Sequence, residues 1–173
     1  MPKIIENLRE KLMAEARLQV NQLGYGQITV RGIASACGVG VGTVYNYFPS
    51  KEHLIAAFMM EDWNIALSEM LIAPESGDAR SLLHSEYKGL SSFVHSHQKL
   101  FSDPDAIRIF SSVARDRHPM LRRQLSEPLE KILSDSGKAN ASFLAVFLTE
   151  SLMTWCLAGV SEEELFSVLD PLL

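Results

Sequence analysis

Residues 40–51 carry hydroxyl, amide and phenol groups at helical spacing. At about 100° per residue, Val41, Val44 and Phe48 fall within about 60° of one another and make one apolar face. An asparagine amide can make a bidentate contact with adenine, and hydroxyls can bond to bases or to phosphate oxygens. We therefore expect the other face to contact a nucleic acid; it carries Gly42, Thr43 and Asn46, flanked by Tyr45 and Tyr47.

A preceding helix and a glycine turn must position this face. Thr29 can cap a helix through its hydroxyl. Gly38 follows the last apolar residue of that helix, where a glycine usually ends a helix in a left-handed conformation. Residues 29–48 thus predict a helix-turn-helix, and the apolar positions of its first helix are Val30, Ile33, Ala34 and Cys37.

The residues after the second helix favour the same polyanionic partner. Pro49 cannot continue a helix, Ser50 can cap the next one, and Lys51 can reach a phosphate from its first turn. The alternative is an ordinary corner between two helices whose polar residues face water. Ala34 and Gly38 weaken that alternative, because such small residues let two helices cross as closely as a helix-turn-helix requires.

This stretch resembles the N-terminal domain of the TetR family of bacterial repressors, whose pattern is roughly T-x-x-x-I-A-x-x-A-G-V-S-x-G-T-x-Y-x-Y-F-x-x-K-E-x-L. The chain departs from the pattern at Cys37, which replaces alanine, and at Gly40, which replaces a serine that would cap the second helix. The matching positions are Thr29, Ile33, Ala34, Gly38, Val39, Gly42, Thr43, Tyr45, Tyr47, Phe48, Lys51, Glu52 and Leu54.

The resemblance implies how the polar residues meet DNA. It makes Tyr45 and Asn46 the residues nearest the bases. The phosphate contacts that it implies are Thr29, Thr43, Tyr47 and Lys51. Together with Arg31 and Gly42, these residues are the predicted DNA-binding set.

The charge of the chain is divided unevenly along its 173 residues. Residues 1–60 hold six Lys and Arg and four Asp and Glu, a net charge of +2, whereas the remainder holds ten and seventeen, a net charge of −7. A basic N-terminal part and an acidic remainder would orient the molecule on a polyanion. We expect a DNA-binding domain over residues 1–50 and a second domain over 51–173.

Apolar residues at helical spacing predict an all-α fold, with no convincing strand or repeat. Asp103 and Pro104 can start one helix, and Pro128 should kink or split another. Ser161 and Glu164 form a capping box for the last helix. The expected helices outside the helix-turn-helix are 3–23, 51–71, 79–98, 104–116, 119–135, 139–158 and 161–169.

The helix over 139–158 is apolar nearly all round, which predicts that it is buried on two sides. One side can face its own domain and the other a second copy; in the family that the chain resembles, the last two helices of each subunit form a four-helix dimer interface. A central helix in a monomer is the alternative. We expect a homodimer on a palindromic operator, with an interface formed by Phe143, Phe147, Leu148, Leu152, Trp155, Leu165, Phe166 and Leu169.

The middle of the chain offers candidates for an effector pocket, because aromatic, histidine and methionine side chains could line an apolar cavity. Most of them could equally be core residues. The candidates are His84, Tyr87, His95, Phe101, Phe110, Met120 and Trp155.

Catalysis and metal binding are not expected. His95 and His97 point about 200° apart on a regular helix and could share an ion only at an irregular helix end. No nucleophile elbow, Walker loop or HExxH is present, so no enzyme, cofactor or metal is predicted. Cys37 and Cys156 fit buried positions, although a redox-sensing thiol stays open.

No apolar stretch of membrane-spanning length and no signal peptide is found, so we expect a cytoplasmic protein without a membrane partner. These observations together predict a transcriptional repressor that a small-molecule effector releases from double-stranded DNA. A DNA-binding regulator without such a ligand is the first alternative, and a helical interaction module or an enzyme is the second.

Overall fold

The computed structural model describes residues 6–72 and 77–173, and these residues form helices without strands. The predicted all-α fold is therefore confirmed. The chain divides into two compact units. Unit 1 comprises Met1–Asp62 and His97–Ser112, and unit 2 comprises Trp63–Ser96 and Val113–Leu173. The division into domains over residues 1–50 and 51–173 stays a prediction.

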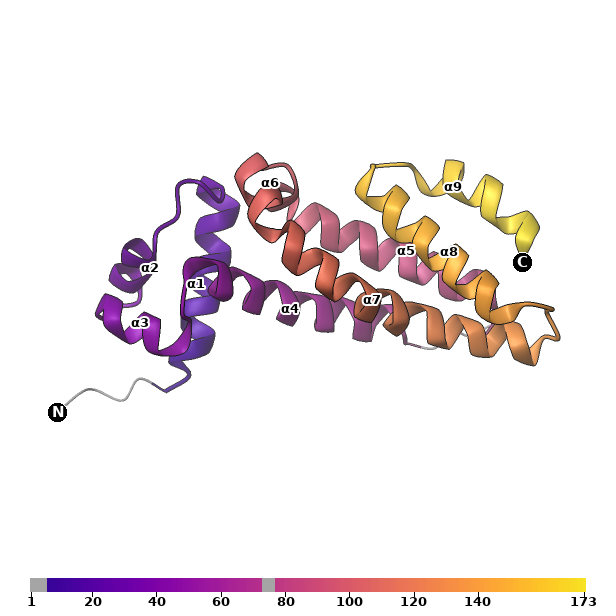
Figure 1. Ribbon diagram of the computed structural model, residues 1–173, viewed down its shortest axis with the longest axis horizontal. Coiled ribbons are helices and arrows are strands. Elements are labelled where there is room, and N and C mark those ends of the chain that lie inside the picture. Colours follow the sequence, from indigo (N-terminus) through magenta and orange to yellow (C-terminus); the bar gives the residue numbers. More distant parts are fainter. Residues whose placement is uncertain (1–5, 73–76) are drawn as a thin grey trace. The chain divides into compact units, whose positions relative to one another are not determined.

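Unit 1 contains the helix-turn-helix. Its first three helices are α1 (Leu8–Leu23), α2 (Val30–Ala36) and α3 (Val41–Tyr47), and Figure 1 shows α2 and α3 close together beside α1. The beginning of α4 (Lys51–Met70), the short α6 (Gln98–Phe101) and the beginning of α7 (Pro104–Asp135) complete the unit. Its core includes Leu12, Val20, Ile33, Ile55, Phe58 and Leu100.

Unit 2 is a bundle in which α5 (Ala79–Ser96) packs most extensively against α8 (Ala141–Leu157). The remaining parts of α4 and α7, together with α9 (Glu162–Leu169) and a terminal 3-10 turn (Asp170–Leu172), belong to the same unit. Leucines fill its interior, among them Leu83, Leu125, Leu129, Leu148 and Leu152.

The caps predicted at three helix starts are confirmed. The Thr29 hydroxyl accepts a hydrogen bond from the Gly32 N–H at 3.0 Å, and the Ser161 hydroxyl accepts one from the Glu164 N–H at 3.2 Å. The Asp103 carboxylate accepts bonds from the N–H groups of residues 105 and 106, so α7 begins at Pro104 as expected. Each cap satisfies N–H groups that a helix start leaves without a partner.

The prediction of two helices over 104–116 and 119–135 was wrong, because α7 continues through Pro119 and Pro128. The buried Leu125, Leu129 and Leu133 explain the continuity at Pro128, since they form one stripe along the helix and an interruption would break their burial. Pro119 is exposed, where water can bond the carbonyl that lacks an N–H partner.

Two smaller expectations also need correction. The first helix begins at Leu8 rather than at residue 3, and residues 3–5 lie outside the described part of the chain. Helix α5 ends at Ser96, because the chain turns at His97 and forms the unpredicted α6.

Within residues 6–72 and 77–173, no helix is both long and apolar enough to cross a lipid bilayer.

Candidate nucleic-acid interface

The first helix of the helix-turn-helix, α2, is capped by Thr29 at its start and packs against the core of unit 1. Gly32 lies close to its cap, because an added Cβ there would be 3.2 Å from the Thr29 hydroxyl. Ile33 and Ala34 are buried against the core of unit 1. The N-terminal side of α2 thus points Thr29 and Arg31, both exposed, away from the core.

The turn between α2 and α3 is a Schellman motif. The Gly38 N–H donates to the Ser35 carbonyl at 3.1 Å, and the Val39 N–H donates to the Ala34 carbonyl at 2.9 Å. Gly38 has a φ of +67°, the left-handed conformation predicted from its position. These two bonds end α2 and direct the chain into α3.

Helix α3 is held down by the residues that the sequence predicted. Val44 is 1% exposed and Phe48 is 4% exposed, while Val41 is partly buried against the same core. Gly40 stands at the N-cap without a side-chain bond. We call the exposed side of α3 the recognition face; it comprises Gly42, Thr43, Tyr45, Asn46 and Tyr47.

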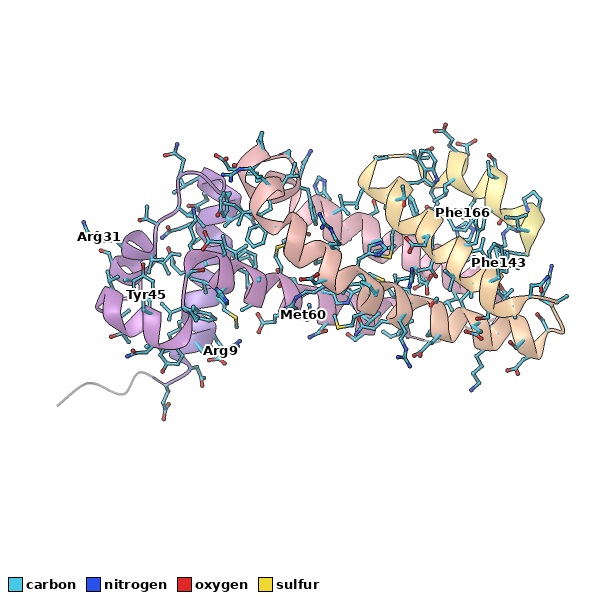
Figure 2. The ribbon with its side chains drawn as sticks, in the orientation of Figure 1. Arg9, Arg31, Tyr45, Met60, Phe143 and Phe166 are labelled. Carbon is cyan, nitrogen blue, oxygen red and sulfur yellow. The ribbon has the colours of Figure 1, made fainter. Side chains whose placement is uncertain are left out.

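The recognition face presents its polar groups to solvent. Tyr45 is 50% exposed and Tyr47 is 45% exposed, Asn46 and Gly42 are exposed, and Thr43 is partly buried. Figure 2 shows Tyr45 over α3 and Arg31 projecting from unit 1. Amide, phenol and guanidinium groups in this arrangement can bond to base edges and to phosphates.

Lys51 has a structural partner that the sequence did not reveal. Its ammonium donates to the Tyr25 carbonyl at 3.2 Å and lies 3.8 Å from the centre of the Tyr25 ring. The Tyr25 hydroxyl in turn donates to Glu52 at 2.9 Å, and burial raises the pKa of this phenol. Lys51 therefore ties the first turn of α4 to the loop between α1 and α2, which leaves its other N–H donors for a phosphate.

A second network joins α1 to α4 and to the start of α6. The Arg17 guanidinium donates to both Asp62 oxygens, at 2.9 and 2.6 Å, and to Glu61 at 2.9 Å. The buried His97 ring lies 3.0 Å from Asp62 and stacks on Phe58. These charge-assisted bonds fix the helices that support the recognition face.

The candidate effector residues are divided between the two units. In unit 1, Phe110 packs edge-on against Tyr25 and Phe101 packs near His97. In unit 2, His84 bonds to Glu162 at 2.7 Å and stacks on Phe166, while the Tyr87 hydroxyl donates to the Val160 carbonyl. His95, Met120 and Trp155 are exposed. The structure does not gather these seven side chains around one cavity.

A cavity of about 460 Å³ lies elsewhere in unit 2. It is open to solvent and is bordered by the start of α5, the last turns of α7 and Leu173. None of the predicted effector residues lines it; its walls are Gly77, Asp78, Ala79, Arg80, Ile132, Leu133, Asp135, Ser136 and Leu173.

The residues predicted for the dimer interface fall into two groups. Phe143, Phe147 and Trp155 on α8 are 74%, 46% and 48% exposed. The others are buried within unit 2 of the single chain; these are Leu148, Leu152, Leu165, Phe166 and Leu169. Figure 2 shows Phe143 on α8. We call Phe143, Phe147 and Trp155 the outer face of α8.

Neither of the two cysteine thiols has the lowered pKa of a reactive cysteine. Burial raises the pKa of Cys37, and it raises the pKa of Cys156 to about 12. Reactive cysteines have lowered pKa values. Among the described residues, no group of three or more His, Cys, Asp and Glu side chains is arranged to hold a metal ion.

Sequence reasoning missed one polar residue of unit 2. Glu86 is completely buried on α5, with Leu82 and Leu90 one turn away on either side. Its position was readable from the sequence, because it interrupts a stripe of leucines at a spacing of four.

Residues 12–58 match the family model described as bacterial regulatory proteins, tetR family. The chain is 26% identical, over 98% of its length and 95% of the relative, to the HTH-type transcriptional repressor Rv1474c of Mycobacterium tuberculosis. It is 33% identical to the uncharacterized HTH-type transcriptional regulator YuxN of Bacillus subtilis, over 41% of the chain and 25% of that relative. A crystal structure of a transcriptional regulator from Cytophaga hutchinsonii has the same fold, with a TM-score of 0.67, 21% identity and coverage of 96% and 93% of the two chains.

Proposed function

The chain belongs to the TetR family of bacterial regulatory proteins, and we propose that this transcriptional regulator is a repressor that binds a palindromic operator as a homodimer. A small-molecule effector bound in unit 2 releases it from the operator.

The recognition face of α3 carries the proposal. Val44 and Phe48 are buried beneath it, so the polar residues above them project from a fixed helix. Asn46 has the amide needed for an adenine edge, and the tyrosines have hydroxyls for phosphates. Packing thus explains the apolar residues of α3, but it does not explain the exposed polar ones.

The outer face of α8 supports the homodimer. Phe143, Phe147 and Trp155 fall within about 120° of one another around the helix, so they can be covered by one partner surface. Exposed aromatic residues that share a face mark association surfaces. A second copy also supplies the second α3 that a short recognition helix needs for affinity, with half-sites about 34 Å or a multiple apart.

Helix α4 supports a coupling between effector and operator, since its first residues belong to unit 1 and its last residues to unit 2. We propose that the effector favours a separation of the two recognition helices that no longer fits the operator. A ligand can do this only through different affinities for the two states, and a shift from 99% to 1% bound form requires about 5.5 kcal/mol.

The test is binding of the purified protein to labelled DNA from upstream of its own gene, followed by fluorescence anisotropy over a salt series. We expect saturable binding that an unlabelled fragment of the same sequence competes away and a scrambled fragment does not. Binding that never exceeds that of scrambled DNA at low salt overturns the proposal. A screen for compounds that release bound DNA then tests the effector separately.

A further inference from the structure

The buried side of α5 holds a carboxyl group among leucines. Glu86 is 0% exposed, and its neighbours on the same side of the helix are Leu82, Leu83 and Leu90. Neither carboxyl oxygen has a hydrogen-bond partner among the described residues. Most buried polar atoms in folded proteins do have a partner, so this one requires an explanation.

A buried carboxyl without a partner is costly, and the group avoids part of that cost by staying protonated. Burial raises the pKa of Glu86 to about 8. A leucine at this position would complete the apolar stripe at no such cost. Stability therefore gives no reason for a carboxyl group here.

A second polar atom without a partner lies on α8, the helix that packs most extensively against α5. The Thr149 hydroxyl is completely buried and makes no hydrogen bond within the described residues. A hydroxyl inside a helix can usually bond to the carbonyl four residues earlier, as Ser151 does with Phe147 at 2.8 Å. Thr149 does not, so the α5 and α8 sides of unit 2 each contain an unused acceptor.

The flexible Met70 side chain packs against α5 at Gly89, three residues after Glu86. The Ser85 hydroxyl donates to the Met70 carbonyl at 3.0 Å, and the Met70 side chain covers Gly89, where an added Cβ would be 2.3 Å from the Met70 Cγ atom. Met70 therefore occupies the space next to residues 85–89 of α5. Methionine has three rotatable bonds and can repack around a ligand at low cost.

These groups define the chemistry of an occupant. The surroundings are apolar, and a carboxylate in them pairs best with a cation that donates hydrogen bonds. An anionic ligand would add a second negative charge to a site that already disfavours one.

We propose that Glu86 is the recognition group for the effector, and that the effector is an apolar molecule with a protonated amine. The Thr149 hydroxyl offers a further acceptor, and displacement of the Met70 side chain makes the room. This inference rests on the proposed ligand response. Binding forms no covalent bond: the ammonium group keeps its protons, and Glu86 loses its own proton to the solvent as the ion pair forms.

The probe is octylamine, compared with octanol, octanoate and octyltrimethylammonium, which share its chain and differ in charge or in donors. Calorimetry at neutral pH in two buffers of different ionisation enthalpy measures affinity and proton release together. We expect octylamine to bind most tightly, with close to one proton released, because Glu86 is mostly protonated before binding. For Glu86→Gln, we expect octylamine affinity to fall about tenfold or more and proton release to disappear.

The matched control is Glu163→Gln, the same chemical change at an exposed position on α9, which should bind octylamine as the wild type does. The proposal is overturned if octanoate or octanol binds as tightly as octylamine, if Glu86→Gln leaves octylamine affinity unchanged, or if octylamine does not bind. Operator release is measured separately by anisotropy. Octylamine that binds through Glu86 without releasing DNA sustains the recognition site and contradicts the proposed ligand response.

Discussion

Unit 1 and unit 2 differ in whether their buried polar groups have hydrogen-bond partners. In unit 1, Tyr25 bonds to Glu52, and His97 and Arg17 meet at Asp62. In unit 2, Glu86 and Thr149 are equally buried and have no partner among the described residues. Satisfied networks favour one arrangement of a core, whereas unsatisfied groups leave free energy that a ligand can recover.

The exposed helix faces of the two units also differ in polarity. The exposed side of α3 is polar, with Asn46 as its amide, whereas the exposed side of α8 is aromatic, with Phe143 as its most exposed ring. Unit 1 thus combines a polar exposed helix face with a hydrogen-bonded interior, and unit 2 combines an aromatic exposed helix face with buried polar groups that lack partners among the described residues. Each of the following predictions tests one side of this contrast.

The largest effect is expected from Phe147→Glu on the outer face of α8. A charge in an apolar interface is desolvated without a partner, so we expect the variant to be monomeric. Loss of the second recognition helix should weaken operator binding by more than about a hundredfold. Light scattering measures the mass and anisotropy measures the affinity. Leu18→Glu on α1, at a similarly exposed apolar position, should keep the wild-type mass; a dimeric Phe147→Glu would show that α8 is not the interface.

Glu86 should make folding stability fall as the pH rises. Its pKa moves from an ordinary value of 4.5 to about 8 on folding, so the folded state binds more protons between these values. The contribution of Glu86 to the free energy of unfolding is therefore fully present below the unfolded pKa and is lost as the pH rises through the folded pKa. The change amounts to a few kcal/mol at most. Urea unfolding at several pH values measures it.

The same titration on Glu86→Gln isolates this contribution, because the amide does not titrate. We expect the difference in unfolding free energy between variant and wild type to change steadily between about pH 5 and about pH 8, in favour of the variant. Glu163→Gln should show no such change. A pH-independent difference would mean that Glu86 is ionised in the folded protein.

Asn46→Ala should weaken operator binding by about 1–3 kcal/mol and relax the preference at one base pair, if Asn46 reads a base edge. Lys51→Ala should instead weaken binding to all DNA sequences, and it should also lower Tm because the ammonium holds Tyr25 in place. Anisotropy with operator and unrelated DNA separates the two variants. Equal losses on both DNAs for Asn46→Ala would exclude base reading.

The contrast between the units also explains what the sequence could predict. Thr29, Gly38 and Ser161 act within one helix end, and a local pattern is enough to predict such features. Lys51 was predicted as a phosphate contact, but its bond to Tyr25 spans 26 residues and depends on how α4 meets the preceding loop. The local spacing of residues does not reveal this contact between α4 and the loop that precedes α2.

Unit 2 was harder to predict because its features depend on which helix faces meet. The apolar content of α8 indicated two buried sides, yet Leu148 and Leu152 lie inside while the aromatic residues lie outside. Phe101 and Phe110 suggested an effector pocket but belong to unit 1. Helix α7 continues through Pro128 because its leucine stripe is buried by other helices, and a local pattern does not reveal that burial.

The smallest effect is expected from Gly40→Ser at the start of α3. The backbone there has φ −73° and ψ 148°, which suits any N-cap residue, and an added Cβ would lie 3.9 Å from the Thr43 hydroxyl, an ordinary contact. A serine would cap α3 and offer a hydroxyl to a phosphate. We expect stability to rise by a few tenths of a kcal/mol, and affinity for all DNA sequences to rise about two- to fivefold.

Gly38→Ser is the matched control for this substitution, two residues earlier in the same turn. Its φ of +67° strains any side chain, so the variant should lose stability and should bind DNA no more tightly than wild type. Thermal unfolding and anisotropy measure both variants. Should Gly40→Ser lower Tm as Gly38→Ser does, the glycine at position 40 would be required by the fold of unit 1, and its recognition helix would tolerate less change than its exposed setting indicates.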